Sequence, residues 1–415
     1  MKIFEVLKKN KKIIENFSYL SVIQLLNMLI PLIIFPYLIR VLGSNIYGLV
    51  IYAQAVLGYF VVLINFGFNI TATKEVSIYR NNTKKLNKIL SSILIIKGIL
   101  FLISVMLLSI LIFTIPSFQE HRALFYLTIW MCFYEFIFPV YYFQGIEEMK
   151  YITITTLVSR VVFLFLVFVL VNYPDDYLLV PIINGLGAII AGIISQIIVL
   201  KKGVKYTWQE PYVLKYYLKK SVVMALAYAS NTLKSNLNIV IVKFLFSYKE
   251  VAYFDLALKI SRIGTSFLEL ISVSVFPKMS RDKNKEFLRK VIYLSSTLSI
   301  VFVVVVLLFS PFLVRVLGGK EMLNSVPLLG IVVFFVPFQI LGGLLGRNCL
   351  IVNGYEKDVL FSMAFSSVVY LVSIFIFYFT LKEKMSLNFL GAIFVFSFMV
   401  DTFYRYLRCK KYKIL

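Results

Sequence analysis

Residues 291–314 read VIYLSSTLSIVFVVVVLLFSPFLV, a stretch of more than twenty residues without a charged side chain. A helix needs about 20 predominantly apolar residues to cross the hydrocarbon core of a bilayer, so this stretch predicts a transmembrane helix. The rest of the 415-residue chain has the same character, with 60% hydrophobic and only 15% charged residues. A soluble domain has too much surface to hide such a composition. The sequence therefore predicts an integral membrane protein that crosses the bilayer many times.

The same length criterion divides the chain into twelve predicted transmembrane helices. They are expected at 17–42, 47–70, 89–115, 122–143, 152–172, 177–200, 221–246, 251–277, 291–314, 326–350, 358–380 and 387–407. Basic loops follow the second helix of each half, at 71–88 and 278–290, which suggests internal repetition. The expected fold is all-α, with two pseudo-symmetric six-helix lobes. Residues 1–200 would form the N-terminal lobe, 201–220 a cytoplasmic linker and 221–415 the C-terminal lobe.

The charge of the chain is strongly basic. It has 43 Lys and Arg residues against 20 Asp and Glu residues, which gives a formal net charge of +23. In a soluble protein this excess would indicate nucleic-acid binding, but no zinc-ligand spacing, RNA-binding signature or basic-region heptad accompanies it. Cytoplasmic loops of membrane proteins collect Lys and Arg, and most basic residues between the predicted helices fall on one side. We therefore expect both termini in the cytoplasm and no nucleic-acid partner.

The predicted linker, KKGVKYTWQEPYVLKYYLKK at 201–220, mixes aromatic and basic residues. This composition suits a helix that lies on the inner membrane surface. A solvated linker explains the sequence equally well, and both interpretations stay open.

Charged residues also fall within the predicted helices, where insertion scales assign a central Arg, Lys or Asp a cost of about 2.5 to 3.5 kcal/mol. Such residues usually face a partner charge or a water-filled cavity. Leaving aside the three residues at either end of each predicted helix, the cations are Lys97, Arg160, Lys234, Lys243, Lys259, Arg262 and Arg347, and the anions are Glu135, Asp255, Glu269 and Asp401.

Several of these charges have a simple explanation. Lys243 and Arg347 lie near the ends of their predicted helices and are expected to reach the headgroup region. Lys259 follows Asp255 by four residues, so the two side chains can pair on one face of a helix.

The remaining cations predict a basic, water-filled cavity between the lobes that binds an anionic solute. Arg262 lies near the midpoint of its predicted helix, and a polar stripe with helical spacing runs along the preceding one. The predicted substrate-binding residues are Lys97, Arg160, Lys234, Lys259 and Arg262, with Asn27, Asn231 and Asn238 as supporting polar groups.

The sequence shows no sign of catalysis, a metal site or a cofactor. The one histidine, His121, falls in a short predicted outer loop. No phosphate-binding glycine loop or nucleophile elbow occurs, and the cysteines predict no disulfide framework. The basic N-terminus leads into an apolar run too long for a signal-peptide core, which predicts an uncleaved first helix. These features favour a transporter over an enzyme.

Three stretches of the chain carry a resemblance to a known family. Residues 35–77, FPYLIRVLGSNIYGLVIYAQAVLGYFVVLINFGFNITATKEVS, look like the N-terminal signature of Wzx-type O-antigen flippases. Residues 237–281, LNIVIVKFLFSYKEVAYFDLALKISRIGTSFLELISVSVFPKMSR, resemble the repeat of that signature in the second lobe. Residues 343–361, GLLGRNCLIVNGYEKDVLF, resemble the end of the family's tenth helix and the loop after it. These motifs mark the polysaccharide-exporter branch of the MOP superfamily.

The resemblance implies a flippase that moves undecaprenyl-pyrophosphate-linked oligosaccharide units, such as O-antigen, across the bacterial inner membrane. It implies two six-helix lobes around a cationic lumen that work by alternating access. The expected partners are this lipid-linked oligosaccharide, membrane lipid, and polysaccharide polymerase and chain-length proteins. The energy would come from a proton or sodium gradient or from downstream consumption of the glycan. Residues that could couple transport to an ion are Glu135, Asp255, Glu269 and Asp401.

Two other transporters of the same superfamily stay open as alternatives. A cation-coupled drug antiporter would favour carboxylates in its binding lobe, whereas the predicted helices carry an excess of cations. A lipid II flippase is chemically close but typically has more spans than the twelve predicted here. A polysaccharide polymerase usually needs a sizeable outer loop, and none is predicted.

Overall fold

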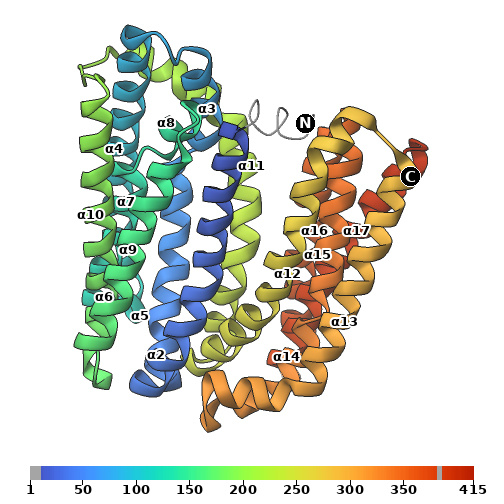
Figure 1. The fold of residues 1–415 in the computed structure, drawn as a ribbon. Helices are drawn as coiled ribbons and strands as arrows, with labels where there is room; N and C mark the ends of the chain where they lie inside the picture. The colour runs from blue at the N-terminus through green and yellow to red at the C-terminus, as the bar shows by residue number, and fades with distance from the viewer. Residues whose placement is uncertain (1–10, 381–385) are drawn as a thin grey trace. The chain divides into compact units, whose positions relative to one another are not determined.

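The computed structural model describes residues 11–380 and 386–415. It leaves undescribed the side chains of residues 11–17, 20, 21, 27, 227, 228, 230–235 and 277. Almost the whole described part is helical and contains no strand (Figure 1). The predicted all-α membrane fold is therefore confirmed, as expected for a chain whose backbone polar groups must be satisfied within each span.

The helices of the first half alternate between long spans and short, broken ones. They are α2 (Lys11–Asn65), α3 (Phe68–Ile78), α4 (Thr83–Thr114), α5 (Pro116–Glu120), α6 (Arg122–Thr128), α7 (Trp130–Ile137), α8 (Val140–Gly145), α9 (Met149–Leu170), η1 (Pro174–Leu178) and α10 (Leu179–Lys201).

The second half begins with three helices of 34 or 35 residues. Its elements are α11 (Pro211–Leu245), α12 (Tyr248–Asp282), α13 (Lys285–Gly318), η2 (Lys320–Ser325), α14 (Val326–Val332), α15 (Phe335–Gly343), the π-helix η3 (Leu344–Leu350), η4 (Ile351–Asn353), α16 (Glu356–Thr380) and α17 (Leu387–Lys411).

Helix α2 contains a break that separates two predicted spans. Gly43 has φ 73° and ψ 163°, outside the helical region. The apolar stretch Val22–Ile78 has 57 residues, about 85 Å of helix at 1.5 Å per residue. The hydrocarbon core is only about 30 Å thick, so one straight span cannot accommodate this length. Gly43 falls between the predicted helices 17–42 and 47–70, where a change of direction is needed.

Nine stretches of the described chain are long and apolar enough to cross a membrane. The predicted helices 221–246 and 251–277 correspond to α11 and α12, which are not among the nine. Both have 35 residues, enough length for a span, but their charged and polar residues interrupt the apolar character. Within the described part of α11, only Asn236–Leu245 forms a short apolar helix. The multi-pass fold is established, and the count of twelve stays a prediction.

In the predicted fourth and tenth spans, the helix is interrupted at or near a proline or glycine residue. Pro139 lies between α7 and α8, and proline cannot continue the hydrogen-bond ladder of a helix. In the tenth predicted span, α15 ends at Gly343 and passes into the π-helix η3. A π-helix leaves its backbone carbonyls in altered positions, a feature common at functional sites.

The chain forms two compact units. The N-terminal unit contains Ala53–Asn236 and the segment that ends at Ile30, and the C-terminal unit contains Pro31–Tyr52 and Leu237–Leu415. The domain boundaries expected from the sequence, with a linker at 201–220, stay a prediction.

Residues 31–52 pack closely with the rest of the C-terminal unit. A Cβ atom added at Gly48 would lie only 1.7 Å from the carbonyl oxygen of Tyr248, so only glycine permits this approach. Arg40 Nη2 donates a hydrogen bond of 2.8 Å to the Val316 carbonyl oxygen. The first half of the chain therefore contributes a helical segment to the C-terminal unit.

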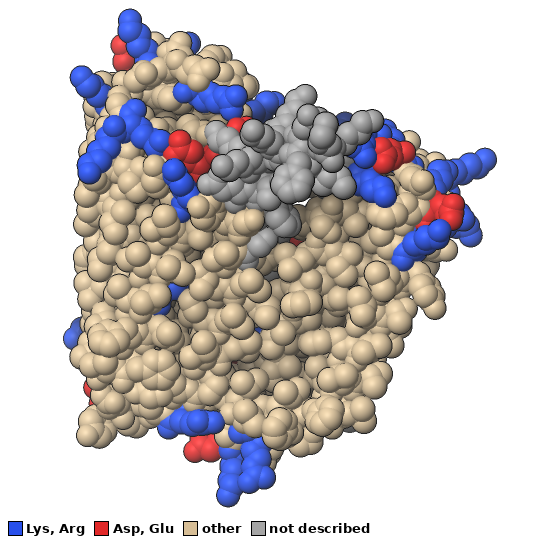
Figure 2. Space-filling model, viewed as in Figure 1, with Lys and Arg blue, Asp and Glu red and all other residues tan. Residues whose placement is uncertain are grey.

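Residues 202–210 pack against the N-terminal unit rather than extending away from it. The backbone N–H of Lys205 donates to Asn87 Oδ1 and that of Thr207 donates to Ser91 Oγ, both at 2.9 Å. Val204 is buried in a cluster with residues of α4 and α8, whereas Trp208 is 83% exposed. In each unit, the face seen in Figure 2 has charged side chains near its ends and few between them. This distribution suits a protein whose middle part lies in hydrocarbon.

Candidate functional site

Lys97 of α4 and Glu135 of α7 form an ion pair inside the N-terminal unit. Lys97 Nζ lies 2.7 Å from Glu135 Oε1 and also donates to the Glu135 carbonyl oxygen at 2.8 Å. Asn65 Nδ2 donates to the same carboxylate oxygen at 2.9 Å. Lys97 is 1% exposed, so its charge is neutralised by a protein partner rather than by water.

The break after α7 explains the second hydrogen bond of this lysine. Pro139 has no backbone N–H and cannot donate to the carbonyl of Glu135, four residues earlier. A buried carbonyl without a donor costs free energy. Lys97 supplies the missing donor and pairs with the carboxylate of the same residue. It therefore stabilises an interrupted helix, and its predicted contact with substrate stays a prediction.

A second paired lysine, Lys259, lies partly buried in the C-terminal unit. Lys259 pairs with Asp255 one turn earlier on α12, as the spacing of four residues predicts. The Tyr47 hydroxyl donates to Asp255 Oδ2 and accepts from Lys259 Nζ, both at 2.7 Å. The ammonium also lies 5.2 Å from the centre of the Phe35 ring. Residues 31–52 thus complete the network around this charge.

Arg160 on α9 and Arg262 on α12 differ from these lysines. Neither guanidinium makes a hydrogen bond or ion pair with any residue in 18–380 or 386–415 whose side chain is described. Arg160 is partly exposed and Arg262 is exposed. An arginine presents several N–H donors in a fixed plane that matches carboxylate and phosphate groups. Within the described part of the chain, these two residues fit the predicted role of binding an anion.

Three predicted site residues lie outside the described side chains, namely Asn27, Asn231 and Lys234. Asn238 is fully buried in the C-terminal unit, where its side-chain oxygen accepts a hydrogen bond from the Tyr370 hydroxyl. Lys243, expected to reach the headgroups, has its Nζ 4.1 Å from the centre of the Tyr248 ring.

The other two predicted ion-coupling acids also have basic partners. Glu269 on α12 lies 3.0 Å from an Nη atom of Arg347 in η3. Asp401 on α17 lies 2.9 Å from an Nη atom of Arg405 one turn later. Each of the four acids proposed for ion coupling is therefore engaged in an ion pair.

Arg405 was not among the predicted site residues, although it is only 4% exposed. It donates to the Ser362 hydroxyl at 2.9 Å and to the Gly342 carbonyl oxygen at 2.8 Å. A Cβ atom added at Gly346 would lie 2.7 Å from Arg405 Nη1, so the glycine makes room for the guanidinium. The signal was present in the sequence, since Asp401 and Arg405 have the same spacing as Asp255 and Lys259.

The sequence pattern also does not predict that Asn65 and Tyr47 take part in the ion-pair networks. Both are uncharged residues in apolar helices, and their partners are 70 and 208 residues away in the chain. No local pattern distinguishes them from other polar residues in a span. In the described part of the chain, no group of His, Cys, Asp or Glu residues is arranged to hold a metal ion.

Comparison with known protein families shows the family to which the chain belongs. A family model described as polysaccharide biosynthesis protein matches residues 13–283, which is more than half of the chain. The chain therefore belongs to this family of membrane proteins.

Two relatives are similar over most of their length. One, from Escherichia coli (strain K12), is named "Putative O-antigen transporter" and is 26% identical over 356 residues, covering 83% of this chain and 85% of the relative. A protein of the same name from Shigella dysenteriae is 26% identical over 350 residues, covering 83% of this chain and 87% of the relative.

Solved structures show the same fold at low sequence identity. The lipid II flippase MurJ in an inward closed conformation matches with a TM-score of 0.77 at 15% identity, covering 96% of this chain and 87% of MurJ. An inward-facing multidrug resistance MATE transporter of the MOP superfamily matches with a TM-score of 0.72 at 15% identity, covering 92% of this chain and 95% of the transporter. At this identity the likeness shows a shared all-α fold, which agrees with the fold predicted from the sequence.

Proposed function

We propose that this protein is a flippase that moves polyprenyl-pyrophosphate-linked oligosaccharide units, such as O-antigen repeats, across the bacterial inner membrane. The observation that carries the proposal is the match to two O-antigen transporters along 83% of the chain, within a polysaccharide biosynthesis family. The fold supports it, because a lipid II flippase has the same helical arrangement. Lipid II and lipid-linked oligosaccharides both carry sugar and phosphate groups, which have to cross the hydrocarbon core of the bilayer.

The anionic part of this substrate needs cations that are not already neutralised. In the described chain Arg160 and Arg262 meet this requirement, one in each unit. We assign them to the pyrophosphate or to acidic sugars, because a planar guanidinium binds such groups through two parallel hydrogen bonds. Lys97 and Lys259 already have carboxylate partners and take a lower rank. Lys234 also stays a candidate, and its side chain is among those that the structure does not describe.

Transport in this proposal follows alternating access between inward-open and outward-open arrangements. A bound anion shifts that equilibrium only if it binds one arrangement more tightly than the other. If an ion gradient drives the cycle, the coupling acid has to leave its basic partner before it accepts a proton or a sodium ion. This condition applies to all four candidate acids, because each is in an ion pair: Glu135, Asp255, Glu269 and Asp401. Consumption of the glycan on the outer side is the other source of energy.

The proposal includes both termini in the cytoplasm, based on the distribution of Lys and Arg. It also includes the polysaccharide polymerase and chain-length proteins as partners, because they would act on the translocated units. The second candidate function is a drug antiporter, which is favoured by the likeness to a MATE transporter. Two relatives that are similar in sequence carry the name "Putative O-antigen transporter", and we rank the flippase first for that reason.

Purified full-length protein in proteoliposomes provides the test. A fluorescent pyrophosphate-linked oligosaccharide is placed in both leaflets, and a membrane-impermeant quencher reports how fast the inner pool becomes accessible. The proposal expects movement at least tenfold faster than in protein-free vesicles. No movement of any such lipid, together with efflux of a cationic dye from the same vesicles, would establish the antiporter instead.

A further inference from the structure

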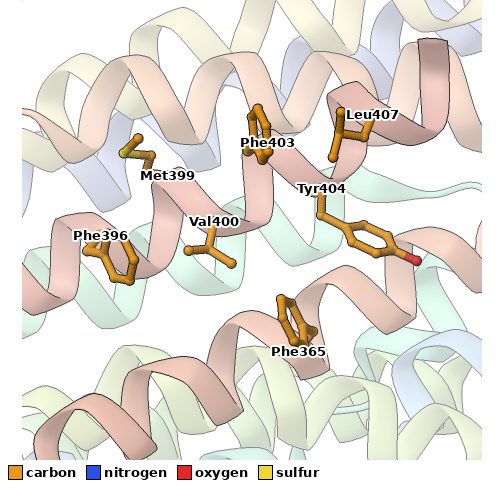
Figure 3. A pocket seen from close by; sticks show the side chains of 7 residues that line it. All are labelled: Phe365, Phe396, Met399, Val400, Phe403, Tyr404 and Leu407. Atoms are coloured by element: carbon orange, nitrogen blue, oxygen red, sulfur yellow. The ribbon is translucent and has the colours of Figure 1, made fainter. Parts of the chain in front are cut away.

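An apolar groove runs along the outer side of α17 in the C-terminal unit. It is an open depression with a volume of about 280 Å³. Figure 3 shows six lining side chains from α17 and one, Phe365, from α16. The residues that line it are Phe365, Phe396, Met399, Val400, Phe403, Tyr404 and Leu407. From Phe396 to Leu407 the groove follows about 16 Å of helix at 1.5 Å per residue.

The groove is open to the surroundings of the protein. Its large apolar side chains on α17, such as Phe403 and Met399, are about half exposed, at 58% and 48%. Both α16 and α17 qualify as membrane spans, so these surfaces contact hydrocarbon rather than water. The occupant of the groove is therefore an apolar chain.

One end of the groove is polar, and Tyr404 connects the two parts. Its ring lines the groove, and its hydroxyl accepts a hydrogen bond of 2.8 Å from Arg408 Nε. Arg408 also lies 3.2 Å from Asp358 Oδ1, and the Tyr412 hydroxyl donates to Asp358 Oδ2 at 2.8 Å. Among the described residues, the two Nη atoms of Arg408 make no hydrogen bond. They remain able to donate to an anionic group at the end of the groove.

The surroundings of this polar end are basic. Lys357 precedes Asp358, Lys410 and Lys411 follow Arg408 within three residues, and all three lysines are exposed. Asp358 is occupied by Arg408 and Tyr412. Cations in the last turn of α17 also compensate the partial negative charge at its C-terminus. A molecule with an apolar chain and an anionic head would satisfy both ends of this site.

We propose that the groove binds the isoprenoid chain of a polyprenyl phosphate, with the phosphate at Arg408. This inference rests on the proposed function, because it assigns a site to the lipid part of the same substrate. A single groove accommodates one chain, as in a polyprenyl lipid, whereas a phospholipid has two. Val400 is the smallest lining residue and lies between the bulkier Phe396 and Phe403 along α17.

Photolabelling tests this assignment without requiring transport. Full-length protein in phosphatidylethanolamine nanodiscs is irradiated with a polyprenyl monophosphate that carries a diazirine on its chain, and labelled peptides are identified by mass spectrometry. We expect labels on the residues of α16 and α17 that line the groove. Val400→Trp, which adds bulk in the middle of the groove, should lower labelling at least fivefold, and Val400→Phe should give an intermediate loss. Arg408→Gln should lower it several-fold by removing the phosphate contact.

The control is Leu308→Trp on α13, an exposed apolar position outside the groove, at 72% exposure, which should leave labelling unchanged. Labelling of α17 that Val400→Trp and Val400→Phe do not reduce would overturn the assignment. So would a diazirine-bearing phosphatidylglycerol that labels the groove as strongly and competes equally. If lipid-linked oligosaccharide is transported without groove labelling, only this inference fails. Labelling without transport would leave the groove assigned and would refute the proposed function.

Discussion

The two lysines Lys97 and Lys259 are held in ion-pair networks, whereas the arginines Arg160 and Arg262 make no such contacts with described residues. Both lysines have a carboxylate partner and a neutral polar group beside it. The difference teaches that a charge within a span has two separate uses. A paired charge fixes helices relative to one another within a unit, and an unpaired one is available for a ligand. Predictions that separate stability from transport therefore test this comparison.

The largest effect on stability is expected at Lys97. Lys97→Met removes the partner of a buried carboxylate and the donor to the Glu135 carbonyl, and breaking a buried pair costs about 3–5 kcal/mol. Denaturant unfolding of the purified protein measures the change. The double variant Lys97→Met with Glu135→Gln should recover a large part of the loss, because no unpaired charge is left. A Lys97→Met protein as stable as the wild type would contradict the pairing.

A smaller loss is expected at Lys259. Its ion pair is more exposed, with side-chain exposures of 18% for Lys259 and 12% for Asp255, and Asp255 keeps its hydrogen bond from Tyr47. We expect Lys259→Met to cost about 2–3 kcal/mol, below the range for a fully buried pair. The same unfolding experiment compares the two lysine variants directly. A loss greater than that of Lys97→Met would reverse the order proposed for the two networks.

Removing one hydroxyl group should have a still smaller effect. Tyr47→Phe deletes both hydrogen bonds of the Tyr47 side chain in the Lys259 network, and side-chain hydrogen bonds in membrane proteins contribute about 0.6 kcal/mol on average. We expect a loss of about 1 kcal/mol. Tyr293→Phe, at a position 76% exposed, is the matched control and should be neutral. If the two variants unfold alike, the Tyr47 hydroxyl has no part in the network.

Much of this fold follows from patterns that are local in the sequence. Apolar length predicts the spans, and Gly43 and Pro139 mark where helices break. The i, i+4 spacing predicts the pair of Asp255 and Lys259, because both residues lie on one face of one helix. The same spacing relates Asp401 to Arg405, and both residues fall within the predicted helix 387–407.

The remaining contacts depend on tertiary packing. Tyr47 reaches Asp255 only because residues 31–52 pack in the C-terminal unit, and one sequence contains no signal for that assignment. Lys97 finds Glu135 across two helices, 38 residues apart. Judged by charge alone, Lys97 and Arg160 have the same predicted role in binding substrate. The pattern of a single span does not show whether a neighbouring helix supplies an oppositely charged partner. Depth in a span indicates that a cation needs a partner but does not identify it.

The groove on α17 illustrates the same limit. Its residues are ordinary lipid-facing positions in the sequence, and only the packing of α16 against α17 forms a depression there. The polar end could be anticipated from the cluster of basic residues after Leu407. Only the structure shows that Tyr404 connects the apolar groove to Arg408.

The smallest effect on stability, and the most direct test of the account, is expected at the arginines. Arg160→Gln and Arg262→Gln remove no hydrogen bond or ion pair with described residues, so each should change the free energy of unfolding by less than about 0.5 kcal/mol. The decisive measurement is the rate at which each variant moves pyrophosphate-linked oligosaccharide in proteoliposomes at equal amounts of folded protein. We predict a loss of about tenfold or more for each variant. Unchanged transport in both, with full stability, would contradict the claim that Arg160 and Arg262 bind the substrate.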